Sequence, residues 1–156
     1  IKNNIDIKNE IEDDKIEDDK IEEISKKADI WEDIQEMQDG LETKIGENGI
    51  KISGGQKQRI QIARNLLNVR NINIFDDTLS ALDIETEKKV IAEIEKQIGN
   101  NTLIVISNKL SMMEKMDKVY LLVDGSIVDS GTHEEMLQKN ELYNELNTYE
   151  KVGDLV

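Results

Sequence analysis

The sequence predicts an α/β fold that follows an all-helical segment, and three observations support this prediction. Two short apolar runs, 71–75 and 102–106, have the length of strands, and the second is uniformly apolar, as buried parallel strands are. Residues 84–98 between them carry isoleucines at helical spacing, so the order is strand, helix, strand. Before residue 70, the apolar residues follow a helical period instead. Strands that alternate with helices from residue 71 onward are typical of α/β proteins.

Length and composition exclude several classes of protein. The chain has 156 residues, enough for one domain, and because it begins with Ile1 we expect it to be a piece of a longer protein. Its longest apolar runs, 103–106 and 119–123, are far shorter than the roughly 20 residues of a spanning helix. The absence of cysteine excludes disulfides and thiolate zinc sites. A net charge of -14 argues against a nucleic-acid partner and against a surface lying on anionic lipid.

The acidity is concentrated at the beginning of the chain, where residues 1–24 hold ten acidic residues and four lysines. Residues 11–20 repeat the five-residue unit IEDDK, which places Ile11, Ile16 and Ile21 five positions apart. Five residues turn a helix by about 140°, so these isoleucines cannot share one face. We therefore predict that 1–17 is a solvated, partly disordered acidic insertion.

Residues 18–69 are predicted to form a helical subdomain. A helical pattern begins at Asp18, and a second helical piece runs from Ile30 to Met37 and stops at Gly40. Residues 43–56 form a glycine-punctuated loop, and 55–68 are predicted as the next helix. The apolar residues expected on the inner faces are Ile21, Ile24, Ala28, Ile30, Trp31, Ile34, Met37, Ile60, Ala63, Leu66 and Leu67.

In the second half of the chain, 70–156, local signals place the helix ends and turns. Asp83 is the expected N-cap of the helix 84–98. A hairpin over 118–129 turns at Asp124-Gly125, after a short helix from Leu110 to about Lys115. The apolar stripe of the helix 84–98 comprises Ile84, Ile91, Ile94 and Ile98. A capping box, Thr132 with Glu135, begins the closing helices, and His133 beside it is expected to be solvated.

The run Ser53-Gly54-Gly55 passes directly into the predicted helix 55–68. Two glycines at a helix start cost backbone entropy, so we ask what requires a bare backbone there. The free N–H groups and the dipole of a helix N-terminus favour an anion. The alternative interpretation is a capping serine followed by a flexible turn.

The first predicted strand ends in two carboxylates, Asp76 and Asp77. In nucleotide hydrolases, the first carboxylate of such a pair holds Mg²⁺ and the second orients or deprotonates the attacking water. The next strand is followed by Ser107-Asn108-Lys109, and ligands bind at the carboxyl ends of strands in doubly wound sheets. Alternatively, the two aspartates are cap or turn residues.

These motifs together resemble the nucleotide-binding domain of an ABC transporter of the exporter type, over nearly all of 1–150. ISGGQKQR resembles the signature motif, NINIFDD the Walker B strand, SALD the D-loop, and TLIVISNKLS the switch-loop strand. TKIGENG, from Thr43 to Gly49, resembles the loop that touches the coupling helices of the membrane domain in exporters. The resemblance implies a partial P-loop NTPase (RecA-like) core with an N-terminal helical subdomain, at the cytoplasmic face of a membrane.

The resemblance also implies roles for individual residues. Ser53, Gly54, Gly55 and Gln56 match the signature that clamps the γ-phosphate of an ATP bound by a partner domain. Asp76 matches the Mg²⁺ ligand, and the catalytic positions fall on Asp77, Asp83 and Asn108. No G-x-x-x-x-G-K-[ST] phosphate loop occurs in the sequence, and in the family it lies upstream. We therefore expect the isolated chain to bind ATP poorly and to be inactive.

Two catalytic positions depart from the family pattern, which usually has Glu at 77 and His at 108. Aspartate is one methylene shorter, about 1.5 Å, and a misplacement near 1 Å can cost about a hundredfold in rate. Asn108 carries no positive charge, although its amide can donate to a phosphate. Family members with one such weakened site are typically heterodimers, so we expect the degenerate-site half of a heterodimeric exporter with an intact signature. A non-hydrolysing regulatory subunit, a non-transport ABC ATPase, an acidic interaction module and a decaying gene are the alternatives. Asn73, a polar residue inside an apolar strand, has no explanation from the sequence.

Overall fold

The computed structural model describes residues 1–7, 18–46, 50–110 and 112–153, and these fall into two compact units. The first unit comprises residues 1–107 and the second 108–156. Each unit is described by itself below. Among the residues described, no helix is both long and apolar enough to cross a membrane.

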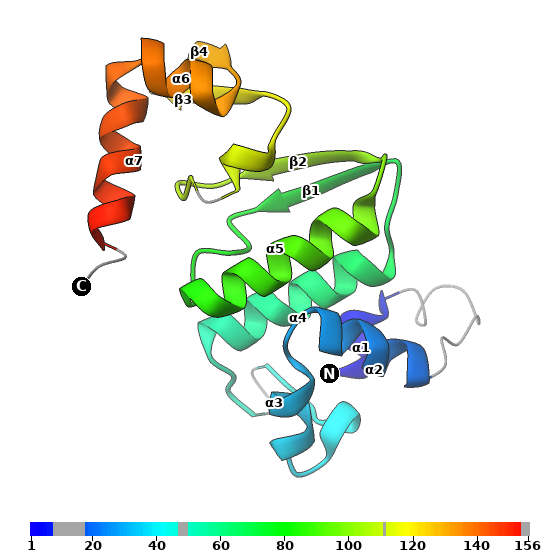
Figure 1. Ribbon diagram of the computed structural model, residues 1–156. Coiled ribbons are helices and arrows are strands. Elements are labelled where there is room, and N and C mark those ends of the chain that lie inside the picture. The colour runs from blue at the N-terminus through cyan, green and yellow to red at the C-terminus, as the bar shows by residue number, and fades with distance from the viewer. Residues whose placement is uncertain (8–17, 47–49, 111, 154–156) are drawn as a thin grey trace. The chain divides into compact units, whose positions relative to one another are not determined.

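Helices dominate the first part of the first unit (Figure 1). Their bounds are α1 (Lys2–Ile5), α2 (Asp18–Lys27), α3 (Trp31–Glu36), the 3-10 turn η2 (Gly40–Glu42) and α4 (Gly54–Leu67). α4 packs against both α1 and α2, so it is the central helix of this group. The core side chains contributed by these elements and by the connection between α2 and α3 include Ile5, Ile21, Ile24, Ala28, Ile30, Ile34, Ile60, Ile62, Ala63 and Leu66. The predicted helical subdomain is therefore helical throughout its described secondary structure, apart from an isolated bridge between Ile45 and Ile50.

We predicted that 1–17 is a solvated, partly disordered insertion, and this is wrong for 1–7, the residues that the structure describes there. Lys2–Ile5 form the short helix α1, and Ile1, Ile5 and Asp6 are buried rather than solvated. The reason is that α1 packs against α4, which covers its isoleucines. The repeat unit itself, in 8–17, lies outside the described residues.

A strand–helix–strand unit completes the first unit of the chain. β1 (Ile72–Asp76) and β2 (Thr102–Ile106) pair in parallel, and α5 (Ile84–Ile98) connects them, with α4 and α5 below the strands in the view of Figure 1. Alternate residues of β1 are buried, so one face of this two-stranded sheet is covered. The opposite face exposes four isoleucines to between 44% and 61%: Ile72, Ile74, Ile104 and Ile106. The expectation of a fully buried second strand is therefore wrong, because β2 also has one open face.

Asn73 occupies the covered face of β1 and is buried, with all of its amide engaged. Its Oδ1 accepts a hydrogen bond from the Arg70 amide at 2.9 Å. Its Nδ2 donates to the Arg70 carbonyl at 2.7 Å and to the Thr102 carbonyl at 3.3 Å. The side chain thus ties the beginning of β1 to the beginning of β2, which accounts for a polar residue in an apolar strand.

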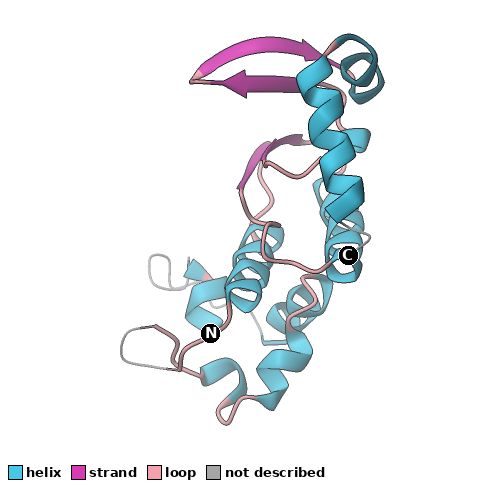
Figure 2. Ribbon diagram, turned by 90° about the vertical axis from the view of Figure 1, so that its left-hand side faces the viewer, coloured by secondary structure: helices cyan, strands magenta, loops and turns pink. Residues whose placement is uncertain are grey.

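The second unit begins with the 3-10 turn η3 (Met113–Lys115), shorter than the predicted helix over 110–115, in which residue 111 is not described. A hairpin of β3 (Val119–Val123) and β4 (Ser126–Gly131) follows, drawn as the two long arrows of Figure 2. Asp124 and Gly125 both have positive φ, 50° and 76°, as a tight hairpin turn requires. The helices α6 (His133–Lys139) and α7 (Glu141–Gly153) close the unit.

His133 is buried, with 6% of its surface exposed, so the expectation that it is solvated is wrong. Its Nδ1 lies 2.9 Å from the hydroxyl of Tyr143, which is itself buried on α7. The capping box predicted at Thr132 and Glu135 is confirmed, and it begins α6 at His133. Because α7 folds back on α6, a first-turn residue that the sequence pattern places in solvent becomes covered.

Candidate functional site

The candidate site begins at the first turn of α4. The Oγ of Ser53 accepts a hydrogen bond from the Gln56 amide at 3.1 Å, and Oε1 of Gln56 accepts one from the Ser53 amide at 2.9 Å. This reciprocal pair is a capping box. It leaves the amides of Gly54 and Gly55 as first-turn donors outside the intrahelical ladder. Ser53 and Gly54 are exposed, so the positive end of α4 faces solvent.

Gly55 lies against the backbone that follows β1. A Cβ atom at this position would lie 3.1 Å from the carbonyl oxygen of Ala81, which is tighter than ordinary contact. At Gly54 the corresponding atom would lie 3.7 Å from Cβ of Ala81, an ordinary van der Waals distance. The close approach therefore explains the absence of a side chain at 55 more directly than at 54.

Gln58 bridges α4 to the turn that follows β1. Its Nε2 donates to the carbonyl of Asp77 at 2.9 Å and to the hydroxyl of Ser80 at 2.8 Å. Its Oε1 accepts from the amide of Ala81 at 2.8 Å. One side chain thus holds the signature-like helix and the two-aspartate turn at fixed separation.

Asp76 and Asp77 lie exposed at the carboxyl end of β1. Asp76 is the last residue of the strand and is opposite Ile106 in the sheet register. Asp77 has a φ of 49°, in the left-handed region, and its amide donates to the Ile106 carbonyl at 2.8 Å. The chain therefore turns sharply after the strand, with Asp77 in a left-handed conformation that aspartate adopts more readily than most residues.

The other two predicted catalytic residues occupy different settings. Oδ1 of Asp83 accepts from the amides of Glu85 at 3.1 Å and Thr86 at 3.0 Å, which confirms Asp83 as the N-cap of α5. Hydrogen bonds from Thr86, chiefly from its backbone amide, hold the pKa of the Asp83 carboxyl below its ordinary value. Asn108 is exposed and is the first residue of the second unit, so the structure places it relative to that unit alone.

A model of the ABC transporter family matches residues 2–80, which is just over half of the chain. The chain belongs to the ABC transporter family. Its fold is accordingly that of a partial ABC ATPase domain, as the resemblance implied.

Curated relatives of this ABC ATPase domain include ATP-dependent lipid A-core flippases. The protein from Francisella tularensis subsp. holarctica is 46% identical over 121 residues, which are 78% of this chain and 20% of the relative. That from Pseudoalteromonas translucida is 41% identical over 123 residues, 79% of this chain and 21% of the relative. Among solved structures, a bacterial Atm1-family ABC exporter with ATP bound superposes with a TM-score of 0.84 at 31% identity, over 96% of this chain and 26% of that one. The chain thus spans about a fifth of the length of these flippases.

The donor set at the end of β1 fits Mg²⁺ held jointly with a nucleotide. Within the described part of the chain, no three acidic, histidine or cysteine side chains converge as a self-contained metal site. Mg²⁺ in nucleotide enzymes is typically bound by one or two carboxylates, with phosphates and water supplying its other ligands. Asp76, exposed at the strand end, is suited to be that carboxylate.

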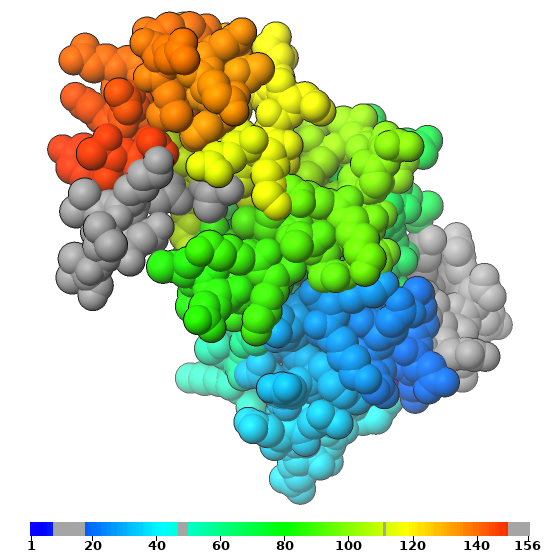
Figure 3. All heavy atoms as spheres, viewed as in Figure 1, coloured from blue at the N-terminus to red at the C-terminus, as the bar shows by residue number. Residues whose placement is uncertain are grey.

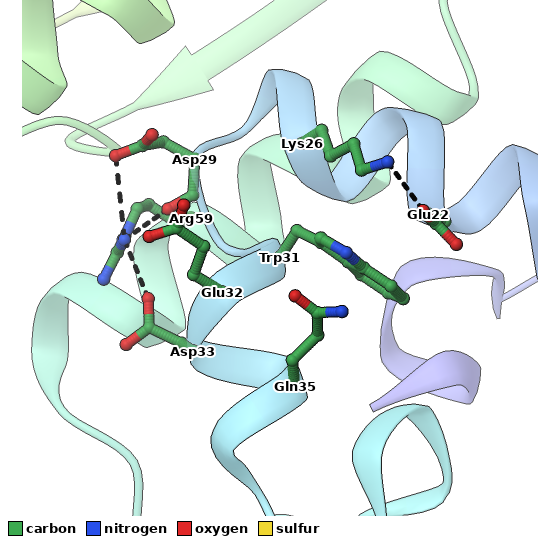
Figure 4. Close-up of a pocket in the computed structure, with 8 residues that line it drawn as sticks. All are labelled: Glu22, Lys26, Asp29, Trp31, Glu32, Asp33, Gln35 and Arg59. Carbon is green, nitrogen blue, oxygen red and sulfur yellow. Dashed lines mark hydrogen bonds and ion pairs between the residues drawn. The ribbon is translucent and has the colours of Figure 1, made fainter.

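The candidate site has neighbours to which the sequence assigned no role. Gln58 is one, and a hollow of about 550 Å³ beside α4 contains others (Figure 4). There Arg59 pairs with Asp33 at 3.0 Å and with Asp29 at 3.9 Å. The available signal was a run of four polar residues, Gln56 to Arg59, in the first turns of a helix whose later residues include the buried apolar side chains of the core.

Proposed function

We propose that this chain is the C-terminal part of the ATPase domain of an ABC exporter, in which ATP binding and hydrolysis drive transmembrane transport. The observation that carries the proposal is the exposed first turn of α4, capped by Ser53 and fixed through Gln58 against the turn after β1. In this proposal the domain works at the cytoplasmic face of a membrane.

The first turn of α4 acts as an anion clamp. The hydroxyl of Ser53 and the amides of Gly54 and Gly55 would donate hydrogen bonds to the γ-phosphate of an ATP bound by a second nucleotide-binding domain. Amides at the positive end of a helix stabilise phosphate charge without reorganising, because the helix already orients them. Gln56 has its amide engaged with Ser53 and Asp33, so its role is to hold the clamp in shape.

The chain also contributes to an ATP site of its own, completed by residues upstream. Mg²⁺ bound at Asp76 would neutralise phosphate charge. Asp77 would orient the attacking water, Asn108 would donate to a phosphate, and Asp83 would set the start of α5. The carboxylate of Asp77 falls short of the glutamate typical of the family by about one bond length, ~1.5 Å. We therefore propose that this is the weaker site of a heterodimer.

The loop from Thr43 to Gly49 would contact the coupling helices of the transmembrane domain. Its described part is anchored, since Thr43 is buried and the Ile50 amide donates to the Lys44 carbonyl at 2.9 Å. Residues 47–49 lie outside the described residues. An anchored loop base suits a contact that transmits movement between domains.

Two substitutions in the assembled transporter test the proposal. Ser53→Arg should lower ATPase turnover by about tenfold or more, because it blocks the clamp that serves the stronger, partner-held site. Asp77→Asn should lower it less, because Asp77 serves the weaker site. Turnover abolished by Asp77→Asn and spared by Ser53→Arg would contradict the heterodimer assignment. Absence of hydrolysis in every wild-type assembly would instead favour a regulatory subunit.

A further inference from the structure

A line of polar contacts connects Ser53 at the start of α4 to Asp83 at the start of α5. Between Gln56 and Thr86 the line passes through the side chains of Asp33, Arg59 and Asp29, none of which contacts Ser53 or Asp83 directly. In order, the residues are Ser53, Gln56, Asp33, Arg59, Asp29, Thr86 and Asp83. Asp29 and Asp33 come from the junction of α2 and α3, and Figure 4 shows both directed at Arg59.

Asp33 makes the contact nearest to the clamp. Its Oδ1 accepts from Nε2 of Gln56 at 2.6 Å, while Oδ2 pairs with Nη1 of Arg59 at 3.0 Å. Because Oε1 of Gln56 holds the Ser53 amide at 2.9 Å, Asp33 fixes both the position and the rotation of the Gln56 amide. Reversal of that amide would direct a donor at the Ser53 N–H and a carbonyl at the Asp33 carboxylate, both unfavourable.

Burial strengthens the contacts around Arg59. The side chain of Arg59 is 17% exposed and that of Asp33 is 25% exposed, so water screens their charges only in part. Arg59 also donates through Nη1 to the backbone carbonyl of Asp29. Hydrogen bonds between charged groups are about twice as strong as neutral ones, so Arg59 holds the α2–α3 junction against α4 firmly.

The far end of the line reaches α5. Oγ1 of Thr86 donates to Oδ2 of Asp29 at 3.3 Å, and the Thr86 amide donates to Oδ1 of Asp83 at 3.0 Å. Lys89, one turn further along α5, lies 3.9 Å from Oδ1 of Asp29. In Figure 3 the blue atoms of the segment around the α2–α3 junction border the green atoms of α5. The α2–α3 junction thus contacts both helices whose first turns carry site residues.

We propose that Asp33 is a positioning residue of the phosphate clamp, acting on Ser53 through Gln56 without touching nucleotide. This inference rests on the proposed role of Ser53. The carboxylate of Asp33, on α3, holds two donors that both lie on α4: Gln56, which caps the clamp, and Arg59, which also contacts Asp29. Its removal frees the Gln56 amide to rotate and the Ser53 cap to fray, so the clamp loses its fixed geometry.

The test uses the full-length transporter with its natural partner, and ATP as the substrate. Asp33→Ala should lower kcat about tenfold with a smaller change in KM, because clamp geometry matters most in the closed, reacting state. Asp33→Asn keeps an acceptor for Gln56 and should recover part of the loss. Glu32→Ala is the matched control, an exposed acid on the same helix and in the same hollow, and should leave kcat unchanged.

A double-mutant cycle separates positioning from general stability. Asp33→Ala and Ser53→Ala should be strongly non-additive in kcat, since both remove the same clamp. If the two substitutions lower kcat by independent factors that multiply in the double variant, the role of Asp33 is wrong. It is also wrong if Asp33→Ala reduces the amount of folded protein but leaves kcat per folded molecule unchanged. If Ser53→Ala lowers kcat while Asp33→Ala does not, the role of Asp33 is wrong and the proposed function stands. If Ser53→Ala and Ser53→Arg both spare turnover, the clamp itself is wrong, and the role of Asp33 with it.

Discussion

The side chain of Gln58 and the backbone of Ala81 are joined by a hydrogen bond of 2.8 Å, although 23 residues separate them in the chain. The same amide group donates to the Asp77 carbonyl and the Ser80 hydroxyl. Gln58 is therefore a fixed strut between the start of α4 and the turn after β1. Its contacts require both a donor and an acceptor on one side chain.

Replacing Gln58 by glutamate keeps the shape and removes the donor. Gln58→Glu should lower the free energy of unfolding by about 1–3 kcal/mol, because a carboxylate oxygen would then face the Asp77 carbonyl. Urea unfolding followed by the fluorescence of Trp31, the single tryptophan, measures this in the first unit. Gln61→Glu, on the same helix, is the control and should change stability little. Equal losses in the two variants would mean that added charge, rather than the strut, is responsible.

Gly55 and Gly54 offer a second matched pair on α4. Gly55→Ala should destabilise by about 1–3 kcal/mol, because the new methyl group would crowd the Ala81 carbonyl and backbone cannot swing aside. Gly54→Ala has room for its methyl group, and should be neutral or gain a few tenths of a kcal/mol from reduced entropy of the unfolded chain. Thermal unfolding of both variants measures whether Gly55→Ala is less stable than Gly54→Ala. A more stable Gly55→Ala would show that the turn 77–82 yields easily.

Asp129 makes the second unit sensitive to acid. Lys139 donates to its carboxylate at 2.7 Å, and Asn140 and the Ser130 amide donate at 3.0 Å and 2.8 Å. These hydrogen bonds, that from Lys139 first, lower the pKa of Asp129 to about 2. A carboxyl with a depressed folded-state pKa stabilises the fold above its unfolded pKa of about 3.9, and the contribution is lost as pH falls toward 2.

Asp129→Asn should lower the free energy of unfolding relative to wild type, by an amount that depends on pH. At about pH 5 the variant should be less stable, and the difference should shrink as pH falls below about 4. Urea unfolding followed by circular dichroism at several pH values measures it. Asp124→Asn, in the hairpin turn, is the control and should track wild type. If the difference in free energy of unfolding stays constant from pH 5 to pH 3, it does not come from the ionisation of Asp129.

Restoring the weak site gives a prediction about rate. Asp77→Glu with Asn108→His should raise turnover of the assembled transporter only modestly, because the partner's signature must still clamp the ATP on this side. The backbone adds a second limit, since the left-handed φ of 49° at position 77 suits aspartate better than glutamate. The measurement is the ATPase rate of the double variant compared with that of wild type in the assembled transporter. A rise to about twice the original rate would mean that both sites are competent and the asymmetric assignment is wrong.

Local features of the fold could be predicted from the sequence, and features with distant partners could not. The caps at Asp83 and Thr132 and the turn at Asp124-Gly125 depend on neighbours within three residues, so their signals are written locally. The buried state of His133 depends on a tyrosine ten residues away. The hydrogen bond from Asn73 to Thr102 spans 29 residues.

The same distinction applies to the candidate site. Ser53, Gly54 and Asp76 indicate phosphate and metal chemistry when their motifs are considered together, although each motif alone also fits a cap or a turn. The residue types of Asp33 and Arg59 do not indicate phosphate or metal chemistry, because a charged residue on a helix is usually solvated. Only the tertiary fold brings Asp33 to the Gln56 side chain, 23 residues later in the chain.

The open face of the β1–β2 sheet has a consequence for synthesis in the cell. Four exposed isoleucines on two adjacent parallel strands make an apolar surface, and an exposed apolar patch of this kind favours association with other apolar surfaces. As long as this face is exposed after translation of β2, the nascent domain is open to misassembly. We therefore expect chaperone binding during translation to concentrate on Ile72–Ile106, and a charged residue at Ile74 or Ile104 to reduce it.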